Sequence, residues 1–552
     1  MPHQGKIVKG LFAIFPILAK AASSCYPVCM MDDILPLTVE GLSHDGRGVA
    51  RHDGRVVLVR GALPGQSIRA RIVRGKARLL EAIVCEELDA PAHAAPPICP
   101  HAPLPDGSGG LLPGCGGCPL QRMQPSTQLV WKRRLALDAL SRIGRLDAAQ
   151  LEELMPLPAP SPLLRAFRNK MEFAFGCDPA GRLILGQRER GGLGVTATPH
   201  CAILPDAGRS ILPVVEALVR RTGLAPYVPP PTRPSPQGKH AGYRAQGRDH
   251  QGPQDTHKNT RGFWRFLTLR QGWQDGREGW WAILLTSPGS VTQRAVVRTL
   301  AEKILEDCPQ LSAVIHEERR QADALCQGQE RVFCLSAGGM EPDAANLTLP
   351  LGGLTFRLDA ASFFQVNSGA AELLVAGAQA MLPMPQGEES LLDMYCGVGA
   401  PGLLLAGRYA SLLGVEYDAR AVRAARHNAM TAGFSHCRHE SGDAGRLLQR
   451  LLAKGPTAMA RFAAPFRTVL ADPPRAGIDQ TALQALLELG PEHILYISCN
   501  PATLARDAAS LASAYHLEAL AGVDLFPHTP HLECLSLWRR TGAEAKRFSV
   551  GH

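Results

Sequence analysis

Residues 390–405 read SLLDMYCGVGAPGLLL, which is an apolar run, a glycine-rich turn and the start of a second apolar run. The first run predicts a buried strand, and Pro401 suits the first turn of a helix, where no backbone N–H is needed. Gly397, Gly399 and Gly402 allow the backbone to approach a ligand closely. A strand, a glycine-rich turn and a helix in this order indicate an α/β fold with a parallel sheet.

The next apolar run supports a nucleotide site at this turn. Residues 412–415 form a short apolar strand that ends in Glu416, 23 residues after Asp393. An acid at this place accepts hydrogen bonds from ribose hydroxyls. The ligand is then a dinucleotide or S-adenosylmethionine. Because the turn reads D-x-Y-C-G-x-G and not G-x-G-x-x-G, we favour S-adenosylmethionine.

Two further strands deliver reactive side chains. Residues 468–471 lead into Asp472, and the two prolines that follow stop the strand. Residues 493–498 lead into Cys499. In open α/β sheets the ligand lies outside the carboxyl ends of the strands, so both side chains are expected there. A cysteine at such an exit is placed as a nucleophile, although a lone cysteine is also a common small core residue.

The last acidic candidate is Glu533. It stands at the end of FPHTPHLE (526–533), before an apolar run over 535–538. A carboxylate there can act as a general base. The alternative is a solvated glutamate on an edge strand.

Positive charge is concentrated near the N-terminus. The chain has 59 Lys+Arg and 50 Asp+Glu, a formal charge of +9, and residues 47–78 hold nine basic residues and one acid. Apolar and basic residues alternate over 55–60 and 67–74, which predicts strands with one apolar and one basic face. A small β-barrel with a basic face suits the phosphates of a nucleic acid. A solvated face without a partner is the alternative.

Composition and cysteine spacing exclude several classes. The chain is 45% hydrophobic and 20% charged, so it is not a disordered protein, and its 55 glycines follow no collagen period. No apolar run reaches 18 residues, so we expect no membrane span and a cytoplasmic protein. Fifteen cysteines are too few for a disulfide scaffold, but Cys99, Cys115 and Cys118 are grouped, which favours a metal or redox site.

Four motifs, in order along the chain, closely resemble those of the RNA uracil-5-methyltransferases. They are DMYCGVG, ADPPRAG, YISCNPATLARD and FPHTPHLE, with SFFQVN (362–367) upstream. The stretch GLSHDGRGVA (41–50) resembles a TRAM domain, an OB-like RNA-binding module. With the cysteine group, the chain looks most similar to the 23S rRNA branch, since the tRNA branch typically lacks both features.

The resemblance implies a class I Rossmann-like S-adenosylmethionine methyltransferase domain, an N-terminal OB-like β-barrel (TRAM) and a mixed α/β central domain. The sequence also predicts a helix over 126–146, with leucines on an apolar side and Lys132, Arg133, Arg134 and Arg142 on the polar side. The apolar start of the N-terminal extension also fits a signal peptide. We expect an N-terminal extension (1–33), a TRAM domain (34–90), a central domain (91–355) with a disordered insertion (227–260), a catalytic domain (356–541) and a tail (542–552).

The resemblance also implies roles for the reactive residues. The thiolate of Cys499 would add to uracil C6, which makes C5 nucleophilic, and Glu533 would remove the C5 proton after methyl transfer. Asp472 would contact the ligands, and the base would leave its stack to reach these groups. The implied donor-binding residues are Gln365, Tyr395, the backbone near Ala400, Glu416, Asp443 and Asp472. Many members have a polar residue at the position of Ala400.

A [4Fe–4S] cluster is implied at Cys99, Cys115, Cys118 and a distant cysteine. The family spacing is C-x₅-C-x₂-C, whereas fifteen residues separate Cys99 from Cys115 here, as a loop insertion would. The distant ligand is expected to be Cys201, with Cys177 as the rival. Zinc is the alternative metal, because four thiolates suit it as well.

The leading hypothesis is therefore methylation of uridine C5 in RNA, with ribosomal RNA as the partner, no membrane partner and a monomeric protein. The alternatives are a tRNA-directed enzyme, an RNA cytosine-C5 enzyme, and an RNA-binding iron–sulfur protein with a degenerate methyltransferase fold.

Overall fold

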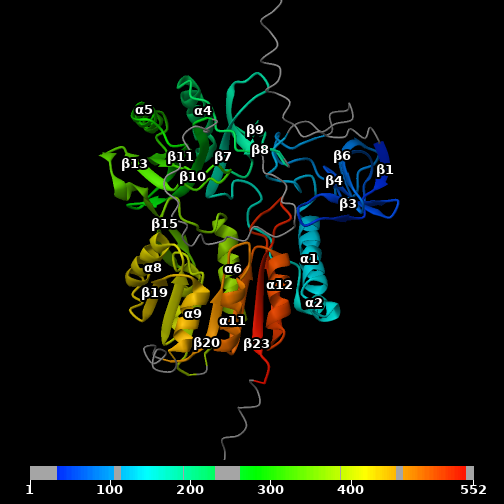
Figure 1. Cartoon of the computed structure of the whole chain (residues 1–552), viewed down its shortest axis with the longest axis vertical. Coiled ribbons are helices and arrows are strands. Elements are labelled where there is room, and N and C mark those ends of the chain that lie inside the picture. The colour runs from blue at the N-terminus through cyan, green and yellow to red at the C-terminus, as the bar shows by residue number, and fades with distance from the viewer. Residues whose placement is uncertain are drawn as a thin grey trace, which may run out of the picture. The chain divides into compact units, whose positions relative to one another are not determined.

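The computed structural model describes residues 34–104, 114–190, 192–230, 262–385, 387–454 and 464–542 (Figure 1). The expected N-terminal extension, nearly all of the 227–260 insertion and all but the first residue of the expected tail lie outside these ranges. The chain divides into two compact units. The smaller unit is built mainly from residues 47–91 and the strand before them, and the larger unit extends from residue 113 onward with two short preceding segments.

The smaller unit holds most of a six-stranded sheet with the order β1-β5-β6-β4-β3-β2. Alternate residues of the fifth strand, Ile68, Ala70 and Ile72, are buried, whereas Arg69 is exposed, which confirms the predicted two-faced strands. The first strand also contacts the third, so the sheet curls on itself. The strands are β1 (Ile34–Thr38), β2 (Gly41–Leu42), β3 (Gly48–His52), β4 (Arg55–Arg60), β5 (Ser67–Lys76) and β6 (Leu79–Glu87).

The N-terminal part of the larger unit is a mixed sheet covered by helices. The strand order is β14-β13-β12-β11-β10-β7-β8-β9, and β15 joins it through β10. Helices α4 (Ile211–Arg221) and α5 (Val291–Asp307) pack on it through a shared apolar cluster. The strands are β7 (Lys170–Cys177), β8 (Leu183–Arg188), β9 (Val195–Ala197), β10 (Trp264–Gln274), β11 (Arg277–Thr286), β12 (Leu311–Glu318), β13 (Glu330–Ser336), β14 (Gly339–Met340), β15 (Asn346–Leu351) and β16 (Leu354–Asp359).

The helix expected over 126–146 is α1 (Pro125–Arg142), followed by α2 (Ala148–Leu154). It ends before residue 146 because Arg145 adopts a left-handed conformation with φ 57°, which an α-helix cannot contain. The sequence places Lys132 on the polar side of this helix, and that prediction is wrong. Lys132 is fully buried, because it meets a buried aspartate from a distant part of the chain.

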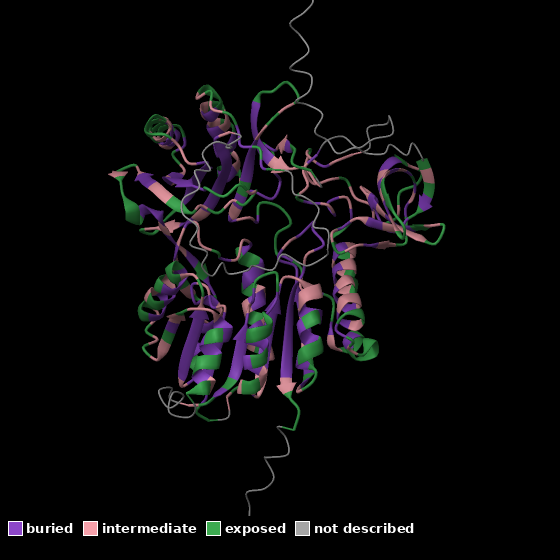
Figure 2. Ribbon diagram, in the orientation of Figure 1, coloured by how far each residue is buried: buried purple, intermediate pink, exposed green. Residues whose placement is uncertain are grey.

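The C-terminal sheet has seven strands in the order β19-β18-β17-β20-β21-β23-β22. All neighbouring pairs are parallel except those that involve β23. Figure 2 shows these strands buried while the outer faces of the flanking helices are exposed. The strands are β17 (Ser390–Met394), β18 (Ser411–Glu416), β19 (Cys437–Ser441), β20 (Phe466–Ala471), β21 (His493–Ser498), β22 (Tyr515–Val523) and β23 (Glu533–Arg540).

Helices cover both faces of this sheet, as in a doubly wound fold. One apolar cluster joins the strands to α1, α9, α11 and α12, and another joins them to α6. Among the residues that the structure describes, no helix is long and apolar enough to cross a membrane. The helices are α6 (Ser368–Met381), α7 (Ala400–Leu403), α8 (Ala419–Thr431), α9 (Ala444–Ala453), α11 (Gln480–Leu489) and α12 (Pro501–Leu511).

Candidate active site

Cys499 and Glu533 lie on neighbouring strands at one edge of the C-terminal sheet. Cys499 directly follows β21, and Glu533 begins β23, which runs antiparallel beside it. The register pairs Ser498 with Cys534. Cys499 and Glu533 are the next residue on each segment, so they lie opposite each other. β23 lies between β21 and β22, and Glu533 is only 4% exposed, so the alternative of a solvated edge-strand glutamate is wrong.

Asp472 joins this edge from the next strand. It directly follows β20, which is hydrogen-bonded to β21, and its backbone N–H donates to the carbonyl of Met394 at 3.4 Å. The structure thus brings Cys499, Glu533 and Asp472 together at one edge of the sheet, formed by the carboxyl ends of β20 and β21 and the amino end of the antiparallel β23.

The two carboxyl groups hold protons more tightly than usual. Burial raises the pKa of Glu533 to about 8, the charge of Asp472 acts in the same direction, and Arg475 opposes both. Burial raises the pKa of Asp472 to about 7. A carboxyl group with a pKa near neutrality can accept and release a proton under ordinary conditions, as general acid–base chemistry requires.

Cys499 is held as a thiol in the free protein but has a cation beside it. Burial raises its pKa to about 11, and the charge of Glu533 adds to this, whereas Arg475 lowers it by charge and by a hydrogen bond. The backbone carbonyl of Arg475 accepts from Asn500 Nδ2 at 3.2 Å and Thr503 Oγ1 at 3.3 Å. Cys499 also precedes the N-terminus of α12, which favours the thiolate. Sequence reasoning did not single out Arg475, although it stands within ADPPRAG.

The glycine-rich turn is fixed by a buried acid. The carboxylate of Asp393 accepts from the backbone N–H of Gly402 at 3.0 Å, and a Cβ at that glycine would lie 2.4 Å from the same carboxylate oxygen. Gly399, with φ 88°, caps α7. Asp393 is fully buried, so its hydrogen bond holds the turn in place from the protein interior.

The expected donor-binding residues gather around this turn. Glu416 ends β18 and accepts from the backbone N–H groups of Gly397 at 3.1 Å and Asp418 at 2.8 Å. The Tyr395 hydroxyl is buried and has no hydrogen-bond partner among the described residues. Asp443 caps α9 by accepting from the backbone of Arg446.

The remaining contacts of this region come from Ala400 and from a loop between β16 and α6. Ala400 is the first residue of α7, so its backbone N–H group is free of the helical ladder. The backbone carbonyl of Gln365 accepts from Asn169 Nδ2 at 3.0 Å, and Arg270 donates to the carbonyls of Ala360 and Ser362. These bonds fix the loop from the central sheet.

The two aromatic residues of this loop differ in environment. Phe363 is 71% exposed, whereas Phe364 is buried and packs against Phe356 with ring centroids 5.9 Å apart. Phe363 is therefore the one available to a ligand, and Phe364 belongs to the core.

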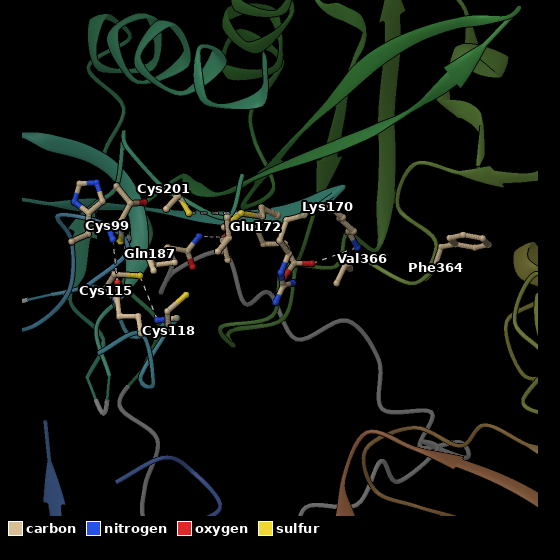
Figure 3. Close-up of a pocket in the computed structure, with 18 of the residues that line it drawn as sticks. Cys99, Cys115, Cys118, Lys170, Glu172, Gln187, Cys201, Phe364 and Val366 are labelled. Carbon is tan, nitrogen blue, oxygen red and sulfur yellow. Dashed lines mark hydrogen bonds and ion pairs between the residues drawn. The ribbon is translucent and has the colours of Figure 1, made fainter. Parts of the chain in front are cut away.

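Four cysteines from three segments line one cavity of about 310 Å³ (Figure 3). They are Cys99, Cys115, Cys118 and Cys201, and they gather at one end of the view while Phe364 lies at the other. Cys177 is exposed at the end of β7 and does not line it.

Burial raises the pKa of the Cys115, Cys118 and Cys201 side chains, which holds them as thiols unless a metal group binds them. Burial raises the pKa of Cys115 to about 12, and the neighbouring thiols Cys201 and Cys99 raise it further. Arg168 lines the same cavity, and its Nε is buried without a hydrogen-bond partner in the described ranges. Four thiolates beside one cation suit the charge and donor set of an iron–sulfur cluster or of zinc. Within the described residues, no group of three or more His, Cys, Asp or Glu side chains has the geometry of a metal-ion site.

Two family models match the chain. The model described as tRNA (Uracil-5-)-methyltransferase matches residues 340–541, and the TRAM domain model matches residues 33–85. An uncharacterized RNA methyltransferase of Nitratidesulfovibrio vulgaris is 34% identical over 503 residues, which cover 91% of this chain and 95% of the relative. One of Geobacter sulfurreducens is 29% identical over 520 residues, covering 94% and 92%.

A solved structure has a similar fold. It is the tRNA (uracil-54, C5)-methyltransferase of Pyrococcus abyssi in complex with S-adenosyl-L-homocysteine, with a TM-score of 0.62 and 22% sequence identity. The match covers 91% of this chain and 100% of that chain. At this identity the likeness establishes a methyltransferase fold.

Proposed function

This chain belongs to the RNA uracil-5-methyltransferase family, and we propose that it methylates C5 of a uridine in 23S ribosomal RNA. The observation that carries the proposal is the meeting of Cys499 and Glu533 on hydrogen-bonded strands, with Asp472 and Arg475 beside them. A nucleophile and a buried carboxyl group with a pKa near neutrality are the two groups that this chemistry needs.

The reaction begins at Cys499. Its thiolate forms a bond to C6 of the flipped uracil, and the electrons of the C5–C6 double bond move onto C5 and the C4 carbonyl. Arg475 stabilises the thiolate before it attacks, because it lies within hydrogen-bonding reach of the sulfur. S-adenosylmethionine would supply the methyl group: as C5 bonds to the methyl carbon, the bond from that carbon to the sulfonium sulfur breaks and S-adenosylhomocysteine leaves.

Glu533 completes the cycle. Its carboxylate takes the proton from C5, the C5–C6 double bond re-forms, and the bond between C6 and the sulfur of Cys499 breaks. The raised pKa of Glu533 makes it a stronger base than an exposed glutamate. Asp472 lies beside both groups and is proposed to contact the ligands.

The donor is proposed to bind along the glycine-rich turn. Glu416 and Asp443 would accept from the ribose and adenosine portions, and the buried Tyr395 hydroxyl and the backbone at Ala400 would contact the remainder. Gln365 would face the methionine end. These assignments rest on the family motifs, and the positions of Tyr395, Ala400 and Glu416 at the glycine-rich turn support them.

The cysteine cavity is proposed to hold a [4Fe–4S] cluster through Cys99, Cys115, Cys118 and Cys201. No step of the methylation needs an electron, so the role of the group would be structural. The TRAM domain and the cysteine group are the features that support ribosomal RNA over tRNA as the substrate. We further propose that the protein acts as a monomer in the cytoplasm.

The decisive experiment is to map 5-methyluridine in ribosomal and transfer RNA from cells with and without this protein. We expect one position of 23S rRNA to lose its methyl group and to regain it with the wild-type chain but not with Cys499→Ala. Loss confined to tRNA would overturn the ribosomal assignment, and loss of 5-methylcytidine instead would overturn the choice of base.

A further inference from the structure

The segment that carries Glu533 is irregular but firmly held. Residues 524–532 connect β22 to β23 and end directly at Glu533. Residues 524–532 lie outside the strand ladder, whereas Glu533 is paired with Val523 of β22. Contacts from other segments therefore determine how the chain between these two paired residues approaches the base. The contacts that do so come largely from one face of α1, almost 400 residues earlier in the chain.

Lys132 supplies the first contact. It is fully buried, and its Nζ donates to Asp524 Oδ1 at 2.5 Å and to the carbonyl of Phe526 at 3.0 Å. Asp524 is itself only 3% exposed. A lysine that gives up its hydration completely needs such partners, and here both lie on the segment before Glu533.

Gln128, one helical turn earlier, supplies the second. Its side-chain oxygen accepts from the backbone N–H of His528 at 2.8 Å. Its Nε2 donates to the carbonyls of Met123 at 2.7 Å and Leu120 at 3.1 Å, and lies 3.3 Å from His528 Nδ1. One buried amide thus joins the segment before Glu533 to the segment before α1.

His528 is held in a conformation that it would not adopt alone. Its φ is +65°, a left-handed value that is uncommon outside glycine. Two contacts hold His528 in addition to Gln128. Its backbone carbonyl accepts from the Leu120 N–H at 2.8 Å, and its Nε2 lies 2.9 Å from the Leu164 carbonyl. Backbone strain of this kind persists only where the surroundings over-determine it, and it is concentrated at functional sites.

The same contacts reach the cysteine cavity. Leu120 is two residues after Cys118, which lines that cavity. The hydrogen bond from Leu120 to His528 therefore connects the segment that carries Cys118 to residues 524–532, which lead into Glu533.

We infer that Gln128 and Lys132 are positioning residues for Glu533, which fix the 524–532 segment and link it to the cysteine-bearing segment. The inference rests on the proposed function, in which Glu533 acts only after the methyl group has been transferred. Loss of either residue then impairs removal of the C5 proton and spares the two earlier steps. A purely structural role would instead reduce every step together.

The test compares two rates in the full-length protein. RNA with 5-fluorouridine at the target traps the enzyme after attack by Cys499 and methyl transfer, because no C5 proton can be removed. RNA with ordinary uridine and radiolabelled methyl donor reports how long the methylated covalent adduct persists on denaturing gels. Arg294→Met is the matched control, since it breaks the contact of Arg294 with the buried Glu318 far from this segment.

For Lys132→Met we expect trapping at the wild-type rate per folded molecule and an adduct that persists about 10- to 100-fold longer, as a misplacement of the order of 1 Å would cause. Arg294→Met should leave both rates unchanged. If Lys132→Met does not fold, the same two rates are measured for Asp524→Asn. Asparagine keeps the shape of the aspartate side chain and removes only the negative charge that holds Lys132. A wild-type adduct lifetime, or trapping slowed as much as resolution, would overturn the inference. Failure of the wild-type protein to be trapped at all would overturn the proposed function instead.

Discussion

Cys499 and Arg475 form a unit in which the arginine offsets the burial of the thiol. The carbonyl of Arg475 accepts hydrogen bonds from Asn500, which caps α12, and from Thr503 in its first turn, so a movement of the arginine would also move the turn that carries Cys499. The reactivity of this cysteine is thus a property of two segments, 472–475 and 499–503.

Replacement of Cys499 by alanine should abolish methyl transfer and leave binding of the donor largely intact, because the sulfur bonds to the uracil and has no part in holding the donor in the proposed mechanism. Calorimetric titration with S-adenosylhomocysteine tests binding, and 5-fluorouridine RNA tests the covalent step. Cys437→Ala, in a strand at the far edge of the sheet, is the control and should be trapped normally. An active Cys499→Ala protein would end the proposed mechanism.

Glu533→Gln should accumulate a methylated adduct joined through Cys499, since glutamine keeps the size of the side chain but cannot accept the C5 proton. A well-placed base contributes about 10²–10⁴-fold, so turnover should fall by that order while the adduct persists. Glu518→Gln, on β22 and paired with Arg539, should behave as the wild type. Near-normal turnover, or loss of turnover without an adduct, would remove Glu533 from this role.

The raised pKa of Glu533 gives the last step a distinct pH dependence. Because burial holds that pKa at about 8, the carboxylate is the minor form at pH 7, and resolution of the adduct should accelerate as pH rises through 8 and then level off. The same shift makes the folded state bind a proton that the unfolded state releases near pH 4.5, so this group's contribution to stability is lost as pH rises from about 4.5 to 8. Single-turnover adduct lifetimes between pH 6 and 9 test the first statement. A flat profile would contradict it.

At the level of elements, apolar runs predicted the strands of the catalytic sheet well. The runs at 412–415, 468–471 and 493–498 are found within β18, β20 and β21. Because strand ends in such sheets share one edge, the residues that follow them could also be brought together from the sequence. The location of Glu533 could not, since nothing in its local pattern shows that β23 inserts between two other strands.

The burial of Lys132 in α1 could not be predicted from the sequence either. Its neighbours predict an amphipathic α1, and a lysine is normally assigned to the solvent side of such a pattern. Its partner, Asp524, lies far away in sequence, and no periodicity reports a contact of that range. Arg475 was missed for a related reason: its role depends on the turn after β21.

The three segments that bring four cysteines to one cavity give an element-scale prediction. Protein purified without oxygen should be brown and contain about four irons per chain, as a [4Fe–4S] group requires. Cys201→Ser should lose the iron and the colour, whereas Cys177→Ser should keep both, because only Cys201 lines the cavity. Stoichiometric zinc without iron in the wild type would reverse the choice of metal.

For the whole molecule, the basic sheet of the smaller unit should determine RNA affinity without affecting chemistry. Arg74, Lys76 and Arg78 are exposed at the end of β5 and the turn after it. Replacing Arg74 and Lys76 by glutamine should weaken binding and reduce the slope of log K against log salt by about 0.7–0.9 per lost phosphate contact. Filter binding at several salt concentrations measures this, with Arg298→Gln on α5 as the control. An unchanged slope would mean that this face does not contact RNA.

The place of β23 in its sheet has a consequence for the order in which the protein folds. β22 reaches the rest of the seven-stranded sheet only through β23, although β22 precedes it in the chain. While the polypeptide is being synthesised, β22 therefore emerges with no strand to join and must wait until residues 533–540 have followed. Strands β17 to β21 can assemble earlier. Only when β23 is complete does the nascent chain place Glu533 beside Cys499 and cover the exposed edge of β21.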